Sequence, residues 1–240
     1  MLKKHYKKFK RESFPSSCVL KAELEDKFCD IVVDLNWYNI LYNRISFISR
    51  ATQKFENCKY LEIGADHNHC FNSVPVVDKT GVDPKQGGNV RSTSDDFFSN
   101  NKKIFDVVFV DGLHTFEQCR KDIINSINFL KVGGYLFVHD LIPRNFMEEF
   151  VPPMGTPWSG DVWKVGQELC KTDGIEFYVI KADHGVGLVK KIKEKVNYYD
   201  NYSNLKKLKF NDFLEINSEI KYIEANEAMT LIDSDNFNLK

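Results

Sequence analysis

The sequence predicts an α/β fold with a doubly wound, mostly parallel sheet, an antiparallel hairpin at one edge and helical appendages at both ends. Three observations lead to this prediction. A mostly apolar run at residues 105–110, interrupted by Asp106, is typical of a strand buried on both faces of a parallel sheet. Short strand patterns alternate with helical patterns over the core, residues 58–190. The length of 240 residues suits one good core, so we expect a single domain over 1–240.

Composition excludes several classes of function. The net charge is −1 and the sequence pI is about 6.6, so no overall field draws the chain to nucleic acid or to an anionic membrane. No apolar stretch approaches the roughly 20 residues that cross a bilayer. The six cysteines are widely spread without a CxxC pair, and no secretory signal precedes them. We therefore expect a cytoplasmic protein that acts on a small molecule.

Residues 1–57 are expected to form a helical N-terminal cover. The first eleven residues are rich in lysine, which indicates a solvated, frayed end, with an arm for a phosphate-bearing partner as the alternative. Residues 34–56 carry apolar side chains at helical spacing, which predicts an amphipathic helix over the sheet.

The first half of the core contains two short strands and a capped helix. Strands are predicted at 59–63 and 80–82, and the apolar stretch between them contains Pro75, so any helix there is short. A Gln-Gly-Gly loop follows the second strand. Residues 93–98 then resemble a helix start, because Ser and Asp side chains can satisfy its free amide groups.

The run at 105–110 is followed directly by Asp111 and Gly112, and His114 comes two residues later. Ligands of open α/β sheets lie beyond the carboxyl ends of the strands, so an acid and a titratable base at such an end indicate an active site. The alternative is that Asp111 only caps the next helix and that His114 is a surface residue.

The second half continues the alternation and then changes in character. A helix is predicted at 115–130 and a buried strand at 135–138, ending in His139 and Asp140. Residues 143–160 contain four of the seven prolines, which indicates a lid loop rather than a core element. A helix at 161–170 and strands at 175–180 and 187–190, the edge hairpin, are expected next. We interpret the appendage 191–240 as helical packing or as the contact of a homodimer.

Four acids lie at or near the ends of four predicted strands: Glu62, Asp83, Asp111 and Asp140. Since the strands are parallel, all four are expected to face one crevice. Asp83 could accept from two ribose hydroxyls, and Gly64 would let the backbone approach the ligand. The fingerprint G-x-G-x-x-G is absent, which argues against NAD.

A set of motifs now resembles a known family: LEIGAD, GVDP, STSDDFF, FDVVFVDGLHTFEQC, GGYLFVHD and WSGDVWK. In this order and spacing they resemble the Rossmann-like S-adenosylmethionine-dependent methyltransferases. The likeness covers about residues 58–190 and is strongest to the bacterial and viral sugar O-methyltransferase group, which is related to macrolide-sugar and catechol O-methyltransferases.

The resemblance implies a role for each matching residue. It implies that Glu62, Gly64 and Ala65 form the cofactor loop, that Asp83 binds the ribose, and that Ser94 and Asp95 lie beside the adenine. It also implies that Asp111 and Asp140 are metal ligands, with Asp111 next to the cofactor as well, and that His114 is the general base. One position departs from the metal-dependent relatives: Leu141 stands where they offer Asn or Asp, so a third protein ligand is missing.

The function expected from these residues is methyl transfer to a hydroxyl of a sugar or nucleotide-linked sugar of surface polysaccharide biosynthesis. His114, with an ordinary pKa near ~6.5, would accept the hydroxyl proton. Mg²⁺ or Mn²⁺ on Asp111 and Asp140 would lower the hydroxyl pKa, since oxygen ligands favour these ions over zinc.

Four further residues are candidates for substrate binding: His139, Trp158, Asp161 and Trp163. Aromatic faces with a carboxylate suit sugars, and packing within a lid is the alternative. His139 is expected to point to the opposite face from Asp140, because neighbouring residues of a strand alternate. Two other classes of function stay open: a non-catalytic nucleotide-sugar or S-adenosyl binding module, and an NAD-dependent sugar oxidoreductase.

Overall fold

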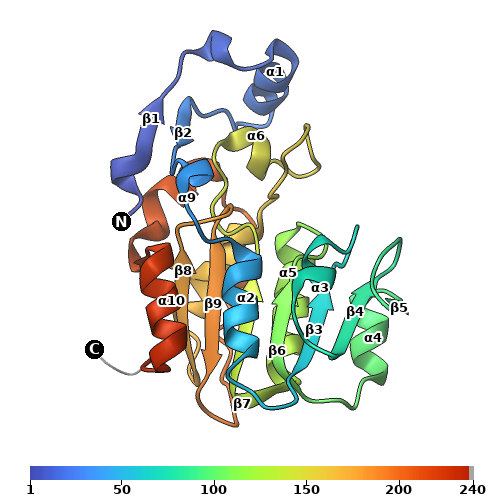
Figure 1. The fold of residues 1–240 in the computed structure, drawn as a ribbon. Helices are drawn as coiled ribbons and strands as arrows, with labels where there is room; N and C mark the ends of the chain where they lie inside the picture. Colours follow the sequence, from blue (N-terminus) through green and yellow to red (C-terminus); the bar gives the residue numbers. More distant parts are fainter. Residues whose placement is uncertain (238–240) are drawn as a thin grey trace.

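A largely parallel sheet with helices on both faces organises the chain (Figure 1). The strands of this sheet are β3 (Lys59–Ile63), β4 (Asp78–Asp83), β5 (Val90–Arg91), β6 (Phe105–Val110), β7 (Leu130–Val138), β8 (Ile175–Ile180), β9 (Val186–Lys191) and β10 (Tyr222–Ile223). In the computed structural model, which describes residues 1–237, their order is β10-β8-β9-β7-β6-β3-β4-β5. Only β9 runs antiparallel to its neighbours β7 and β8 in this described part of the chain. The predicted fold class is confirmed.

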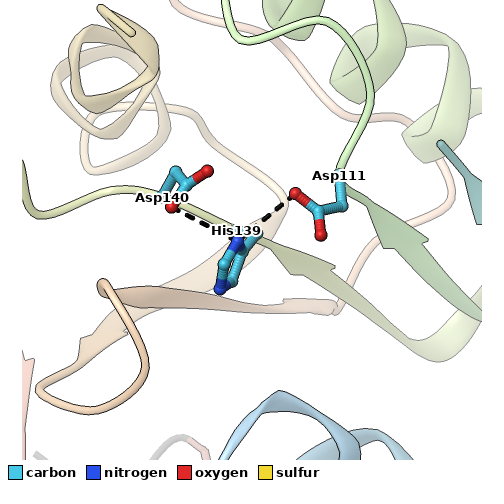
Figure 2. Close-up of side chains that lie close together, drawn as sticks. All are labelled: Asp111, His139 and Asp140. Atoms are coloured by element: carbon cyan, nitrogen blue, oxygen red, sulfur yellow. Dashed lines mark ion pairs between the residues drawn. The ribbon is translucent and has the colours of Figure 1, made fainter. Parts of the chain in front are cut away.

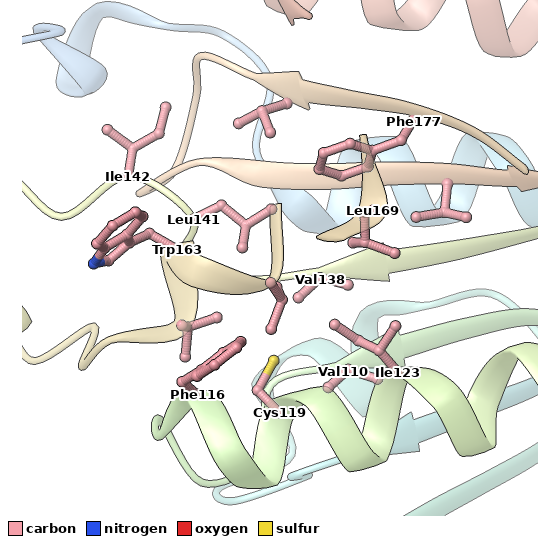
Figure 3. Packing of buried hydrophobic residues seen from close by; sticks show 14 of the residues in the cluster. Val110, Phe116, Cys119, Ile123, Val138, Leu141, Ile142, Trp163, Leu169 and Phe177 are labelled. Atoms are coloured by element: carbon pink, nitrogen blue, oxygen red, sulfur yellow. The ribbon is translucent and has the colours of Figure 1, made fainter. Parts of the chain in front are cut away.

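Strand β6 lies at the centre of the sheet because every residue in it can be buried. Val107 and Phe109 belong to the core on one face, and Val108 and Val110 to the core on the other. This alternation places two apolar layers around one strand, which is why the sequence shows the apolar run at 107–110. Figure 3 shows Val110 and Val138 packed against Cys119 and Ile123 of a covering helix.

The helices divide between the two faces of the sheet. On one face α2 contacts α3 and α10, and on the other α5 contacts α4 and α7. Thr115 accepts a hydrogen bond from the backbone of Gln118 and so caps α5 at the predicted position. The helices are α1 (Ser16–Leu24), α2 (Arg44–Thr52), α3 (His69–Ser73), α4 (Ser94–Asn100), α5 (Phe116–Asn128), α6 (Phe146–Glu149), α7 (Val165–Leu169), α8 (Tyr202–Leu205), α9 (Phe210–Ile216) and α10 (Ala225–Ser234).

Short 3₁₀ helices connect several of these elements. They are η1 (Lys3–His5), η2 (Arg11–Ser13), η3 (Trp37–Asn39), η4 (Val162–Lys164) and η5 (Asn217–Glu219). Among residues 1–237, none of the helices has both the length and the apolar character that a membrane crossing requires.

The predicted helical cover at the N-terminus is partly wrong. Strands β1 (Tyr6–Lys8) and β2 (Ile31–Val33) form a small antiparallel sheet, and Leu2 is fully buried, so the first residues are packed rather than frayed. The helix expected at 34–56 is reduced to η3 and α2. It starts late because Asn43 accepts from the backbone of Ser46, which fixes the helix start there.

The prediction of a lid outside the core at 143–160 is also wrong in part. Phe146 and Phe150 are fully buried, and the rings of Phe146 and Phe14 lie 5.2 Å apart. This segment therefore joins the N-terminal appendage to the main core. Its prolines and acids suggested an exposed loop, but the aromatic residues between them decide where it lies.

Two smaller differences concern the sheet edge. Strand β7 begins at Leu130, before the Gly133-Gly134 pair that was expected to precede it, with an irregular register against β6. The predicted edge hairpin forms as β8 and β9, but β10 pairs parallel to β8 and makes the outer edge. The appendage beyond residue 191 is thus helical with one short strand.

Candidate active site

A cavity of about 910 Å³ lies at the carboxyl ends of β3, β4, β6 and β7. This is the edge at which open α/β sheets bind ligands. Its wall includes most of the residues predicted from the sequence: Gly64, Asp83, Ser94, Asp95, Asp111, His114, His139, Asp140 and Trp158. It also includes residues that sequence reasoning missed: Arg44, Gln118, Asp122, Asp183 and His184.

Asp111 is positioned by the end of the central strand. Its backbone N–H donates to the carbonyl of Ile63 at 2.8 Å, so the residue is fixed between β6 and β3. Burial alone would raise the pKa of Asp111, but the charge of His139 and the hydrogen bonds from His114 and His139 hold it well below its ordinary value. Asp111 is therefore held as an ionised carboxylate at neutral pH.

His139 lies between two carboxylates, with its Nδ1 3.3 Å from Asp111 Oδ1 and 3.3 Å from Asp140 Oδ1 (Figure 2). The expectation that His139 points away from Asp140 is wrong. Strand β7 ends at Val138, and Asp140 adopts a left-handed backbone conformation with φ +64°. The alternation of a regular strand therefore does not extend to Asp140, and both side chains reach the cavity.

The other nitrogen of His139 faces an ion pair that joins distant parts of the chain. His139 Nε2 lies 3.2 Å from Arg44 Nη1 and 3.5 Å from Asp183 Oδ1, and Arg44 Nη1 donates to Asp183 Oδ1 at 2.8 Å. Burial lowers the pKa of His139, but the charges of Asp140 and Asp111 outweigh it and raise the pKa well above the ordinary value. The imidazole is thus held in place from both sides.

His114 reaches the same two carboxylates from the loop before α5. Its Nε2 lies 3.3 Å from Asp111 Oδ1, and its Nδ1 lies 3.1 Å from Asp140 Oδ2 and 2.7 Å from the carbonyl oxygen of Trp158. Burial alone would lower the pKa of His114, but the hydrogen bond that it donates to Asp111 and the charge of Asp140 raise it to about 9. In this arrangement His114 is protonated at neutral pH, which corrects the expectation of an ordinary histidine pKa.

Three groups of this cluster fit a divalent cation. Asp111, His139 and Asp140 each offer one ligand atom, and these atoms lie within 4.8 Å of one another. The two carboxylate oxygens suit Mg²⁺ or Mn²⁺, whereas the imidazole nitrogen is a ligand more typical of zinc, iron or nickel. Leu141 is buried in the core, as expected of a residue without a ligand role, but His139 supplies the third group that the sequence did not predict.

Asp83 lies at the end of β4, as predicted, and its carboxylate is already engaged. Oδ1 accepts from the backbone of Lys85 and Gln86 at 2.7 and 2.9 Å, and Oδ2 accepts from the backbone of Asp66 at 3.0 Å. Burial opposes ionisation, but these bonds keep the pKa of Asp83 below its ordinary value. A carboxylate has about four lone-pair positions, so one remains for a ribose hydroxyl rather than the two expected.

The rest of the predicted cofactor loop does not line the cavity as a unit. Glu62 is buried behind the wall, where it accepts a hydrogen bond from Tyr60, and burial raises its pKa to about 7. Ala65 is buried too. Gly64 lines the cavity with φ +87°, and a Cβ there would lie 2.1 Å from the carbonyl oxygen of Asp111. Glycine is thus required for packing against the Asp111 backbone.

Ser94 and Asp95 stand at the start of α4 and share one partner. Gln118 Nε2 donates to Ser94 Oγ and to Asp95 Oδ1, both at 3.1 Å, and also to Asp122 Oδ1 at 3.1 Å. Burial raises the pKa of Asp122 to about 6. These polar groups line the cavity together and offer donors and acceptors to a ligand.

The predicted substrate platform is broken up. Trp158 lines the cavity, with its ring 5.4 Å from that of His114. Trp163 is buried in the core, where its Nε1 donates to Glu149 Oε1 at 3.2 Å. Asp161 accepts from the backbone of Phe116 at 2.6 Å and pairs with Lys164, so it supports the start of α5 instead. Asp161 and Trp163 are therefore structural residues.

The missed residues differ in the local signal that they carried. Arg44 opens an amphipathic helix and looks like a surface cation in the sequence. Asp183 and His184 form a turn with Gly185 between β8 and β9, and all three have positive φ. An acid and a histidine beside a glycine had marked the Asp111 loop, and the same signal was available here.

Residues 48–141 match the family model of a methyltransferase domain. This range contains β3 to β7 and ends one residue after Asp140, so it includes the cofactor side of the cavity and the carboxylate cluster. No curated protein matches the sequence.

Solved structures of similar fold are distant in sequence. A Staphylococcus aureus protein assigned as a caffeoyl-CoA O-methyltransferase is 17% identical over 75% of this chain and 94% of its own, with a TM-score of 0.46. A Podospora anserina methyltransferase with S-adenosylhomocysteine bound is 15% identical over 75% and 89%, with a TM-score of 0.46. The MycE methyltransferase of the mycinamycin pathway, solved with Mg and S-adenosylhomocysteine, is 16% identical over 61% and 49%, with a TM-score of 0.40. No residue role is carried over at such identities.

Proposed function

Residues 48–141 match a methyltransferase domain, and we propose that the chain is an S-adenosylmethionine-dependent methyltransferase of the Rossmann-like class that methylates a hydroxyl oxygen of a small polar acceptor. The acceptor is a sugar or a nucleotide-linked sugar of surface polysaccharide biosynthesis, a proposal that the motif resemblance supports. One observation supports oxygen as the atom that is methylated. His114 lies beside the Asp111 and Asp140 carboxylates in the wall of the cavity that Asp83 also lines.

His114 is the base in this mechanism, and the reacting nitrogen is Nε2. Nδ1 lies 2.7 Å from the Trp158 carbonyl oxygen, which can only accept, so Nδ1 keeps its proton. Nε2 then takes the hydroxyl proton, and Asp111 Oδ1 at 3.3 Å stabilises the imidazolium that forms. With a pKa of about 9, His114 is neutral in roughly one molecule in a hundred at pH 7. The carboxylates therefore make His114 a stronger base but lower the fraction that can accept a proton.

The chain also has to hold the acceptor in line. Bound S-adenosylmethionine supplies an electrophilic methyl group on its sulfonium, so orientation and proton removal are what remains for the protein. Gly160 holds the Trp158 segment against the His114 loop, since a Cβ at Gly160 would lie 1.7 Å from the His114 carbonyl oxygen. A divalent cation held by Asp111, His139 and Asp140 would lower the pKa of the acceptor hydroxyl.

Calorimetry with S-adenosylhomocysteine and with NAD tests this proposal. We expect S-adenosylhomocysteine to bind and NAD not to bind. A protein that binds NAD instead would be an oxidoreductase, and one that binds S-adenosylhomocysteine but methylates no hydroxyl compound would be a binding module. Either result would contradict the proposed function.

A further inference from the structure

We propose that the non-reacting part of the acceptor binds in a second hollow, formed by residues 34–43, and that this part is an uncharged glycosyl unit rather than a nucleoside diphosphate. The inference rests on the proposed function and narrows its acceptor. The residues that decide specificity would then come from the N-terminal segment before α2, outside the range matched by the methyltransferase domain.

The second hollow adjoins the reaction centre. It has a volume of about 320 Å³, near the lower end of the roughly 300–1,000 Å³ common for small-molecule sites. Asp183 and His184 line both this hollow and the large cavity. Since Asp183 Oδ1 lies 3.5 Å from His139 Nε2, a ligand that fills the hollow lies beside the cluster of His139 and its two carboxylates.

Aromatic rings give the hollow its character. Trp37, Tyr38 and Tyr42 all line it, and the rings of Trp37 and His184 lie 4.6 Å apart. Tyr38 interacts with Arg144 through its hydroxyl, and at 95% exposure its ring offers a face to a ligand. Amide and carboxylate groups surround the rings, among them Asn36 and Asn43. Rings that pack on C–H groups, beside polar groups that bond hydroxyls, suit a sugar.

The charges of the hollow exclude a diphosphate. Arg144 is the cation among the lining residues, and its Nε donates to Glu148 Oε1 at 2.7 Å. The lining carboxylates are paired in turn, Asp183 with Arg44 and Asp34 with Lys7. A phosphate group here would meet two carboxylates and no unpaired cation among the lining residues. An uncharged ligand meets no such penalty.

The test measures binding of neutral glycosides by saturation-transfer NMR in the presence of S-adenosylhomocysteine. The probes are the methyl glycosides of glucose, galactose, mannose, rhamnose and fucose, with UDP-glucose beside them. Tyr38→Ala is the variant, and Leu41→Ala is the matched control, because Leu41 is 84% exposed in the same segment but does not line the hollow. Both changes are at exposed positions, so folding is retained.

We expect at least one methyl glycoside to bind, Tyr38→Ala to weaken it fivefold or more, and Leu41→Ala to leave it unchanged. UDP-glucose should bind no more tightly than methyl glucoside. The inference is overturned if no glycoside binds, if Tyr38→Ala binds like the unchanged protein, or if UDP-glucose binds more than tenfold tighter.

The same samples separate this inference from the proposed function. The affinity for S-adenosylhomocysteine is measured by calorimetry in all three proteins and should be equal. If S-adenosylhomocysteine fails to bind, the proposed function fails. If it binds and a catechol is methylated while no glycoside binds, the proposed function stands and the glycosyl subsite is wrong.

Discussion

Two histidines share two carboxylates at the reaction centre, and the structure gives them different tasks. His114 is half-buried and opens on the cavity, whereas His139 is buried and touches Arg44 and Asp183 behind it. His114 is therefore placed to exchange a proton with a ligand. His139 is placed to hold Asp111 and Asp140 apart and to present its Nδ1 between them.

His114→Ala should lower turnover by ~10²–10⁴, the usual contribution of a general base, with cofactor affinity unchanged. The rising limb of the wild-type pH–rate profile should lie above pH 6.5, because Asp111 and Asp140 raise the pKa of His114, and it should be missing from the variant. His139→Ala should lose both turnover and thermal stability, since the Asp111 and Asp140 carboxylates then lose one of the two imidazolium groups that lie between them. Near-normal turnover in His114→Ala would assign proton removal to another group.

Asp83→Ala should weaken S-adenosylhomocysteine binding at least tenfold by calorimetry. A hydrogen bond to a charged acceptor contributes ~1.5–3 kcal/mol, and one ribose hydroxyl loses its acceptor. The variant should also melt at a lower temperature, because the backbone amides of Asp66, Lys85 and Gln86 lose their partner. Unchanged binding together with a lowered melting temperature would leave Asp83 as a loop-organising residue only.

At the scale of elements, helix α6 contains a buried acid that makes stability depend on pH. Burial raises the pKa of Glu149 to about 8, from an ordinary value of 4.5. The folded protein therefore keeps this proton between pH 4.5 and pH 8 while the unfolded chain has lost it, so stability falls as the pH rises through this window and stays low above it. One unit of pKa difference is about 1.4 kcal/mol, so the loss is on the order of a few kcal/mol.

Glu149→Gln should remove most of this dependence. A neutral amide keeps an acceptor for the indole N–H of Trp163, which donates to Glu149 at 3.2 Å. We expect denaturant unfolding to show the variant more stable than the wild type at pH 8.5 and similar at pH 5. A variant that is less stable at both values would contradict the account of α6.

The predictable elements were those whose local pattern matches their environment. Strands β3, β6 and β8 have the predicted bounds because each is a mostly apolar stretch that is buried in the sheet. The predicted start of the helix at 34–56 was wrong because the spacing of apolar residues does not show that Asn43 caps the helix at a later position. The prediction for 143–160 was wrong because its prolines indicated a loop, whereas Phe146 and Phe150 are buried by tertiary contacts that the local sequence does not show.

The residues of the candidate site also divide into those that local sequence patterns predict and those that only the fold brings together. Asp111, His114 and Asp83 follow strands directly, so topology alone brings them to one edge. The position of His139 depends on the left-handed backbone of Asp140, which no local pattern announces. Arg44 and Asp183 lie 139 residues apart in sequence, and their pairing exists only in the fold.

At the scale of the whole molecule, removal of metal should affect methyl transfer at the carboxylate cluster but not cofactor binding at the Asp83 side of the cavity. A chelator should abolish methyl transfer and leave S-adenosylhomocysteine affinity unchanged, because Asp83 and Ser94 are distinct from Asp111, His139 and Asp140. Added Mg²⁺ or Mn²⁺ should restore turnover. Full activity in excess chelator would mean that the acids act by hydrogen bonding and charge alone.

The most direct test of the central claim follows the methyl group itself. The protein is incubated with S-adenosylmethionine that carries a trideuterated methyl group and with the panel of methyl glycosides, and the products are analysed by mass spectrometry. We predict a trideuteromethyl ether on a hydroxyl oxygen of at least one glycoside, and its near absence with His114→Ala. Label on nitrogen or carbon, or equal product from His114→Ala, would contradict base-assisted O-methylation at this site.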